Sequence, residues 1–179
     1  MPAEIIDETE PLLSAEDAGT RTAQTPSQQS AAEGSASLVS TAEAVMDVLL
    51  HAVDRSDSEV VVVLAGDERI RELNRLWRDK DEATDVLSFS QLEGEPMGSG
   101  AEMLGDIVVS VETLRRQARQ GGWSDQEELA RLLLHGLLHL LGFDHQQADD
   151  ELVMKAQEGI LARTLLGRGL GCAWEDTRP

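Results

Sequence analysis

The run from Leu134 to His145 constrains this chain more than any other part of its sequence. It reads LHGLLHLLGFDH and contains three of the four histidines. His135 and His139 are four residues apart, so on a helix they lie on one face, about 40° apart around the axis. Gly142 stands where such a helix would end in a left-handed cap, and a chain that turns back there returns His145 towards the pair. The spacing predicts a helix, a tight turn and three imidazoles that converge.

Three imidazole nitrogens suit a single zinc ion, with bonds of about 2.0–2.1 Å. Three protein ligands leave the fourth tetrahedral position for water, which is the arrangement of catalytic zinc. We therefore predict one Zn²⁺ per chain, bound by His135, His139 and His145.

Two other interpretations of this run compete with catalytic zinc. A single histidine on an apolar helix is usually a core residue with a hydrogen-bonded ring, but neutral imidazoles among so many leucines would lack obvious partners. A structural zinc site needs a fourth protein ligand. The only cysteine, Cys172, lies in the C-terminal tail, and His51 lies in a helix distant in sequence. The pattern favours an open site.

Length, cysteine usage and the lack of targeting or membrane segments narrow the class of protein. The 179 residues suffice for one domain with a core. One cysteine excludes an intramolecular disulfide framework, the acidic N-terminus lacks the features of a signal peptide, and no apolar run approaches the ~18 residues of a membrane span. We therefore expect a cytoplasmic protein without a membrane partner.

The formal net charge of −19 argues against a nucleic-acid-binding surface that covers the whole chain. Any contact with a polyanion must be local, and two basic segments could supply it. These cations are Arg69, Arg71, Arg75, Arg78 and Lys80 in residues 69–80, and Arg115, Arg116 and Arg119 in residues 113–122. Each segment is explained equally well as a solvated helix face.

Apolar periodicity and turn residues predict the elements around the histidine helix. We expect strands at 3–8, 60–65, 86–90 and 104–110, and helices at 38–54, 67–78, 111–121 and 148–166. Ser124 and Glu127 form a capping box at the start of the histidine helix. Asp67 is predicted to cap its own helix, whose inward residues are Ile70, Leu73, Leu76 and Trp77.

These elements predict one domain, a small sheet flanked by helices. Residues 1–8 hold a possible first strand, 38–166 form the catalytic domain and 167–179 a flexible tail. Residues 9–37, rich in Ser, Thr, Ala, Gln and Glu, bury too little apolar surface to offset the entropy of ordering, so we expect a disordered or loose insertion there. Residues 93–102 are expected to be a flexible loop.

Three ordered motifs resemble those of one known family. The segment from His135 to His145 is similar to the H-G-x-L-H-L-x-G-[YF]-D-H signature of the YbeY family, zinc endoribonucleases that mature ribosomal RNA. Residues 73–78 and 84–89 resemble its L-N-x-x-[YW]-R and T-D-V-L-S-F blocks, and residues 104–107 its L-G-D-I strand. The likeness covers residues 38–166, with Glu4 to Asp7 as a first strand.

The resemblance implies an α+β fold with a mixed, mostly parallel four-stranded sheet flanked by helices, a metalloprotease-like catalytic domain with the metal in a cleft. It implies zinc ligation by His135, His139 and His145, and an essential role for Arg78, whose planar guanidinium suits phosphate. The competing interpretation of Arg78 is a surface salt bridge with Asp79 or Glu82.

Three aspartates near these motifs have open roles. Asp144 either accepts a hydrogen bond from a ligand imidazole or caps the turn that follows it. Asp85 is expected to be a residue of the turn or of the strand entry, and Asp106 a structural group rather than a partner of a ligand.

The preferred function is a single-strand-specific, zinc-dependent endoribonuclease in late small-subunit rRNA maturation and ribosome quality control, with RNA and the ribosomal small subunit or its proteins as partners. One alternative is a ribosome-assembly factor with structural zinc. Another is a zinc protease, which wants H-E-x-x-H with Glu as general base, but this chain has Gly136 at that position.

Overall fold

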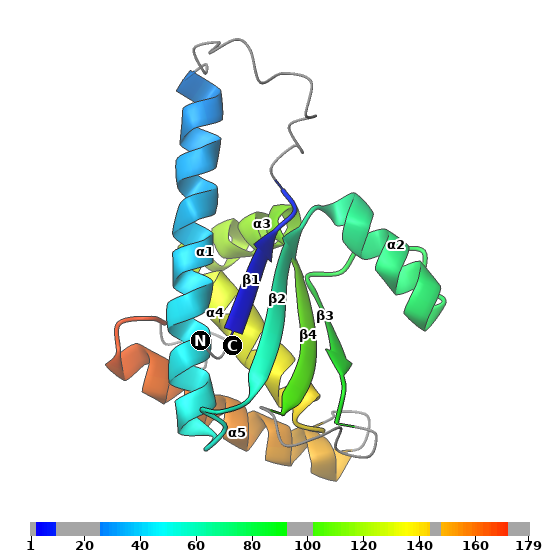
Figure 1. Ribbon diagram of the computed structural model, residues 1–179, viewed down its shortest axis with the longest axis vertical. Coiled ribbons are helices and arrows are strands. Elements are labelled where there is room, and N and C mark those ends of the chain that lie inside the picture. Colours follow the sequence, from blue (N-terminus) through cyan, green and yellow to red (C-terminus); the bar gives the residue numbers. More distant parts are fainter. Residues whose placement is uncertain (1–2, 10–25, 93–101, 144–147, 172–179) are drawn as a thin grey trace.

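The computed structural model (Figure 1) describes residues 3–9, 26–92, 102–143 and 148–171. They form four strands and five helices within these ranges. In chain order the elements are β1 (Ala3–Asp7), α1 (Pro26–Ala52), β2 (Glu59–Ala65), α2 (Asp67–Arg78), β3 (Val86–Ser90), β4 (Met103–Ser110), α3 (Val111–Gly121), α4 (Asp125–Leu140) and α5 (Ala148–Gly167).

The four strands form one sheet in the order β1-β2-β4-β3. β1 runs parallel to β2 and β2 parallel to β4, whereas β3 pairs antiparallel with β4. The predicted mixed, mostly parallel sheet is therefore confirmed, and the possible first strand, β1, lies at its edge. Among the described strands, β3 is the other edge.

The two faces of the sheet carry cores of different size. The larger core packs α1, α3, α4 and α5 against one face, where Val62 of β2 and Ile107 of β4 are fully buried. The smaller core lies on the other face, where α2 covers Leu87 and Val108. Figure 1 shows α2 standing apart from the other helices. Helices α2 and α4 consequently lie on opposite faces of the sheet.

Helix α1 begins at Pro26, well before the expected start at Leu38. Proline fits the first turn of a helix because its missing N–H would be unpaired there in any case. The expectation of a disordered or loose insertion is therefore wrong for residues 26–37, which Figure 1 shows as the end of α1 that extends past the sheet. Their sequence has too few large apolar residues for periodicity to reveal a helix. Residues 10–25 lie outside the described residues.

Helix α2 has the predicted bounds, but its N-cap differs from the one predicted. Its N-cap is Gly66, and Asp67 is the first helical residue. The Asp67 carboxylate accepts hydrogen bonds from the hydroxyls of Ser110 and Thr113. Burial raises the pKa of Asp67, but these hydrogen bonds and the charge of Arg116 outweigh it and lower the pKa. Asp67 thus ties α2 to the start of α3.

The predicted inward position of Leu76 and Trp77 is wrong. Leu76 is 72% exposed and Trp77 66%, whereas Ile70 is fully buried. α2 covers only part of β3 and β4, so its last turn has no layer beneath it to bury both side chains. The Trp77 ring meets the ring of Phe89 edge-on, with centroids 6.0 Å apart.

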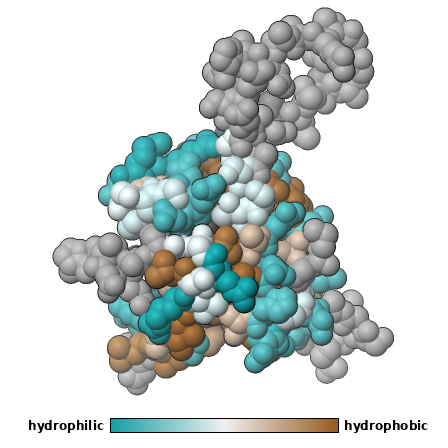
Figure 2. Space-filling model, turned by 90° about the vertical axis from the view of Figure 1, so that its left-hand side faces the viewer, coloured by the Kyte–Doolittle hydropathy of each residue, from teal (hydrophilic) through white to brown (hydrophobic). Residues whose placement is uncertain are grey.

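Backbone hydrogen bonds hold the described C-terminal end up to Leu170. α5 ends at Gly167, and the amide of Leu170 donates a hydrogen bond to the Leu165 carbonyl. The side of the molecule seen in Figure 2 mixes hydrophilic and hydrophobic side chains, with hydrophobic ones gathered in its lower half at the height of α5. Residues 172–179, and residues 93–101 of the expected loop at 93–102, lie outside the described residues.

Across the described ranges, no helix has both the length and the apolar character needed to cross a bilayer.

Candidate metal centre on helix α4

Helix α4 carries the histidine pair and starts as the sequence predicts. The Ser124 hydroxyl accepts a hydrogen bond from the Glu127 amide, and the Glu127 carboxylate accepts one from the Ser124 amide at 2.7 Å. This capping box pairs amide groups that would otherwise be unsatisfied. The helix ends at Leu140, and Gly142 takes a positive φ of 85° as expected for the turn.

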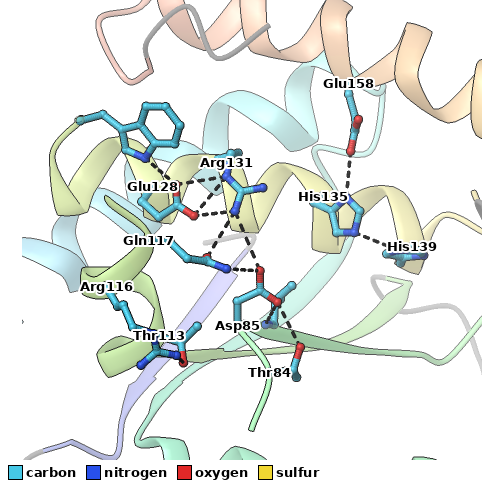
Figure 3. A network of polar contacts seen from close by, with 12 residues as sticks. Thr84, Asp85, Thr113, Arg116, Gln117, Glu128, Arg131, His135, His139 and Glu158 are labelled. Atoms are coloured by element: carbon cyan, nitrogen blue, oxygen red, sulfur yellow. Dashed lines mark hydrogen bonds and ion pairs between the residues drawn. The ribbon is translucent and has the colours of Figure 1, made fainter. Parts of the chain in front are cut away.

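The rings of His135 and His139 converge (Figure 3). Their Nε2 atoms are 3.1 Å apart, and their planes meet at 82°. Two nitrogens bound to one tetrahedral zinc at about 2.0–2.1 Å lie about 3.3–3.4 Å from each other. The observed separation is close to this value, so the pair fits a shared cation and supplies the ligand type that zinc prefers.

The predicted third ligand, His145, lies outside the described residues, together with Asp144. The chain before it turns as predicted, because the Gly142 amide donates to the His139 carbonyl and the Phe143 amide to the Leu138 carbonyl, each at 3.0 Å. Within the described ranges, no three His, Cys, Asp or Glu side chains are grouped to hold a metal. A site on His135 and His139 therefore needs another ligand, and His145 stays our prediction.

Glu158 of α5 is a residue of the site that sequence reasoning missed. Its Oε1 lies 2.8 Å from Nδ1 of His135, on the ring nitrogen that faces away from His139 (Figure 3). The two residues are 23 positions apart. No local spacing relates them, so only the packing of α5 on α4 could reveal the contact.

A largely buried ion pair lies one to two turns before His135 on α4. Glu128 is fully buried, and the guanidinium of Arg131 donates to both of its carboxylate oxygens. Trp123 donates its indole N–H to Glu128 as well. Burial lowers the pKa of Arg131, but the hydrogen bonds and charge of Glu128, with the carboxylates of Asp85 and Glu158, outweigh it and raise the pKa. The pair fixes the helix just before the histidines.

Asp85 and Asp106 have the structural positions expected of them. Asp85 accepts hydrogen bonds from the Val86 amide at 2.9 Å and from Gln117 at 3.1 Å, at the entry to β3. Asp106 alternates with Ile107 along β4, so it lies on the α2 face of the sheet, away from α4. It is half-buried and accepts a long hydrogen bond of 3.4 Å from Gln91.

Arg78 is the last residue of α2 and is exposed. The alternative salt bridge with Asp79 or Glu82 does not form among the described residues, and Asp81 instead pairs with Arg71 at 2.8 Å. Arg78 and the histidine pair are carried by helices that lie on opposite faces of the sheet. The structure shows no contact between the described atoms of Arg78 and the histidine pair.

The other cations of the two basic segments are partly neutralised. Arg69 pairs with Glu8 and Glu72, and Arg115 and Arg116 pair with Asp125 and Asp67. Among the described residues, Arg75, Arg78 and Lys80 at the end of α2 form no ion pair within 4 Å. The last turn of α2 thus presents cations beside the exposed Trp77.

Gly136 shows why a protease motif does not fit here. A Cβ at this position would lie 2.9 Å from Cγ2 of Ile107 and 3.1 Å from Oγ of Ser88. The position faces the sheet at close range, so there is no room for the glutamate that a zinc protease carries beside its first histidine.

Comparisons with known proteins identify one family. The chain matches the family model described as "Endoribonuclease YbeY" over residues 24–165. It is 51% identical over 123 residues to "Endoribonuclease YbeY" of Anaeromyxobacter sp. strain Fw109-5, which covers 68% of this chain and 62% of that protein. The protein of the same description from Desulforamulus reducens is 45% identical over 136 residues, 73% of this chain and 89% of its own length.

The matched region thus spans less than two thirds of the Anaeromyxobacter protein. The solution structure of TM1509 from Thermotoga maritima has the same fold, with a TM-score of 0.58 at 23% identity over 99% of this chain and 97% of that one. The family match extends over well more than half of the sequence and includes both His135 and His139. The chain belongs to the YbeY family.

Proposed function

We propose that this chain is a zinc-dependent endoribonuclease that cuts single-stranded RNA in late maturation of the small-subunit rRNA and in ribosome quality control. The observation that carries the proposal is the 3.1 Å approach of the His135 and His139 Nε2 atoms in a member of the YbeY family. RNA is the substrate class that the family description implies. The small ribosomal subunit or its proteins are the proposed partners, and the cytoplasm the proposed location.

His135, His139 and His145 are the proposed zinc ligands. A zinc ion held there would supply a Lewis acid that could polarise a phosphoryl oxygen and lower the pKa of water towards ~7. The chain's own contribution is to direct two Nε2 lone pairs at one point. The buried pair of Glu128 and Arg131 supports this by fixing the preceding turn of α4.

The end of α2 is the proposed contact for the RNA strand. Arg78 offers two parallel N–H groups to a phosphate and stabilises the negative charge that develops in the transition state. Trp77 exposes an aromatic face on which an unpaired base can stack, a contact available to single strands and closed to paired bases. An RNA strand bound at both the metal centre and the end of α2 would pass around the edge strand β3.

The test compares zinc-loaded protein on single-stranded RNA, on a duplex of the same sequence and on casein. We expect cuts in the single strand alone, abolished by His139→Ala. Arg78→Lys keeps the charge but loses the planar fork, so it should lower turnover more than the melting temperature. Arg55→Lys is the matched control, because Arg55 pairs with Glu102 and lies outside both basic segments. Cuts that survive His139→Ala would refute the proposal.

The alternative of a binding factor with structural zinc makes a different prediction. Such a protein binds zinc and small-subunit RNA but cuts neither RNA nor casein. A transcript of small-subunit rRNA with an unprocessed end separates the two functions, since only a nuclease shortens it. Cleavage of casein would favour the protease, which the close packing at Gly136 argues against.

A further inference from the structure

We propose that Glu158 is a positioning residue of the metal centre, which holds His135 in the tautomer and orientation needed to bind a cation. The inference rests on the proposed function in one respect, that His135 and His139 share a cation. Its basis is the 2.8 Å contact between Oε1 of Glu158 and Nδ1 of His135. The contact joins α5 to α4 across the side of the histidine that faces away from its neighbour (Figure 3).

The chemistry of imidazole makes this contact directional. A neutral ring carries its proton on one nitrogen and a lone pair on the other. An ionised carboxylate only accepts hydrogen bonds, so Glu158 favours the proton on Nδ1 of His135. The lone pair is then on Nε2, the atom that lies 3.1 Å from Nε2 of His139. The carboxylate selects the tautomer in which both histidines can bind one ion through Nε2.

Glu158 is placed as a partner of a ligand and is not itself a ligand of the same ion. Its oxygen lies on the Nδ1 side of the ring, whereas the two Nε2 atoms face each other on the opposite side. A carboxylate that occupies the Nδ1 position cannot reach that point without breaking its own hydrogen bond. Glu158 therefore does not fill the fourth coordination position of a zinc ion. In a structural zinc site a protein ligand would occupy that position.

The surroundings of Glu158 keep the contact partly shielded from water. The side chains of His135 and Glu158 are 30% and 32% exposed. The charge of Glu158 also reaches Arg131, whose pKa it helps to raise. Glu158 thus lies close to the cationic group of α4 and close to the ring it orients. Outer partners of this kind typically change metal affinity by about 10–100-fold when they are removed.

The experiment measures zinc affinity by competition with a chelator. We expect Glu158→Ala to weaken zinc binding by about 10–100-fold and Glu158→Gln, which keeps an acceptor, to weaken it less. Glu151→Gln is the matched control, because Glu151 is on the same helix and pairs with Lys155 at 2.6 Å. It should leave the affinity unchanged. Equal zinc affinity in Glu158→Ala and Glu151→Gln would overturn the proposal.

A second readout separates positioning from a simple tether between α4 and α5. Nitrogen-15 NMR of the metal-free protein reports the tautomer of His135, which should be protonated on Nδ1 in the parent chain and mixed in Glu158→Ala. A tether alone would lower the melting temperature and leave the tautomer unchanged, which would contradict the proposal. Absence of RNA cleavage by the zinc-loaded parent would refute the proposed nuclease but leave these comparisons intact.

Discussion

Replacement of Gly136 by alanine tests how closely the histidine helix packs on the sheet. The new Cβ would lie 2.9 Å from Cγ2 of Ile107, 3.1 Å from Oγ of Ser88 and 3.3 Å from Cδ1 of Ile107. Carbon atoms in good contact are about 3.5–4.0 Å apart, so the methyl group overlaps Ile107 by at least about 0.6 Å. The Ser88 hydroxyl can rotate away, but Ile107 is fully buried in an inner strand.

Two opposing terms decide the sign of the effect. Alanine favours the helix over glycine by about 1 kcal/mol. Overpacking a core usually costs about 1–3 kcal/mol, and a stiff β-branched neighbour places this site in the upper half of that range. The net loss is about 1–2 kcal/mol of the free energy of unfolding. For a chain of this length that loss lowers the melting temperature by about 2–8 °C.

Thermal unfolding of metal-free protein, followed by far-UV circular dichroism, measures this shift. Gly167→Ala is the control, because Gly167 is also helical and a Cβ there meets nothing within 4 Å. It should keep or slightly raise the melting temperature. A Gly136→Ala chain as stable as its parent would show that α4 and the sheet can separate at little cost, and the packing argument against a protease motif would fail.

Three further predictions concern other residues. Glu128→Ala strands the guanidinium of Arg131 in a largely buried site and should cost about 3–5 kcal/mol in chemical denaturation; a loss below 1 kcal/mol would contradict it. His145→Ala should reduce bound zinc from about one per chain to none, measured by atomic emission, and retained zinc would exclude His145 as the ligand. Because folding lowers the Asp67 pKa below 3.8, its contribution to stability is present above pH 4 and lost in stronger acid. Asp67→Asn should therefore flatten the fall in stability below pH 4, and an unchanged slope would refute this.

The sequence by itself determines the local geometry of the site. The spacing of His135 and His139, the capping box at Ser124 and the turn at Gly142 all operate within a few residues of one helix, where the helical repeat relates the positions directly. Most bounds of the helices and strands were predictable as well, because apolar periodicity and turn residues are also local features of the sequence. The third ligand rests on the same local argument and remains a prediction.

Only the tertiary structure decides which distant residues share the site. Glu158 meets His135 because α5 packs on α4, and Gly136 is confined because Ile107 and Ser88 come from two strands of the sheet. At the end of α2 the apolar periodicity predicts a buried Trp77, but the structure leaves it exposed. Among the described residues, no other layer of the fold covers the last turn of this helix. Spacing along one helix follows from its repeat, whereas contacts between elements depend on how the whole chain packs.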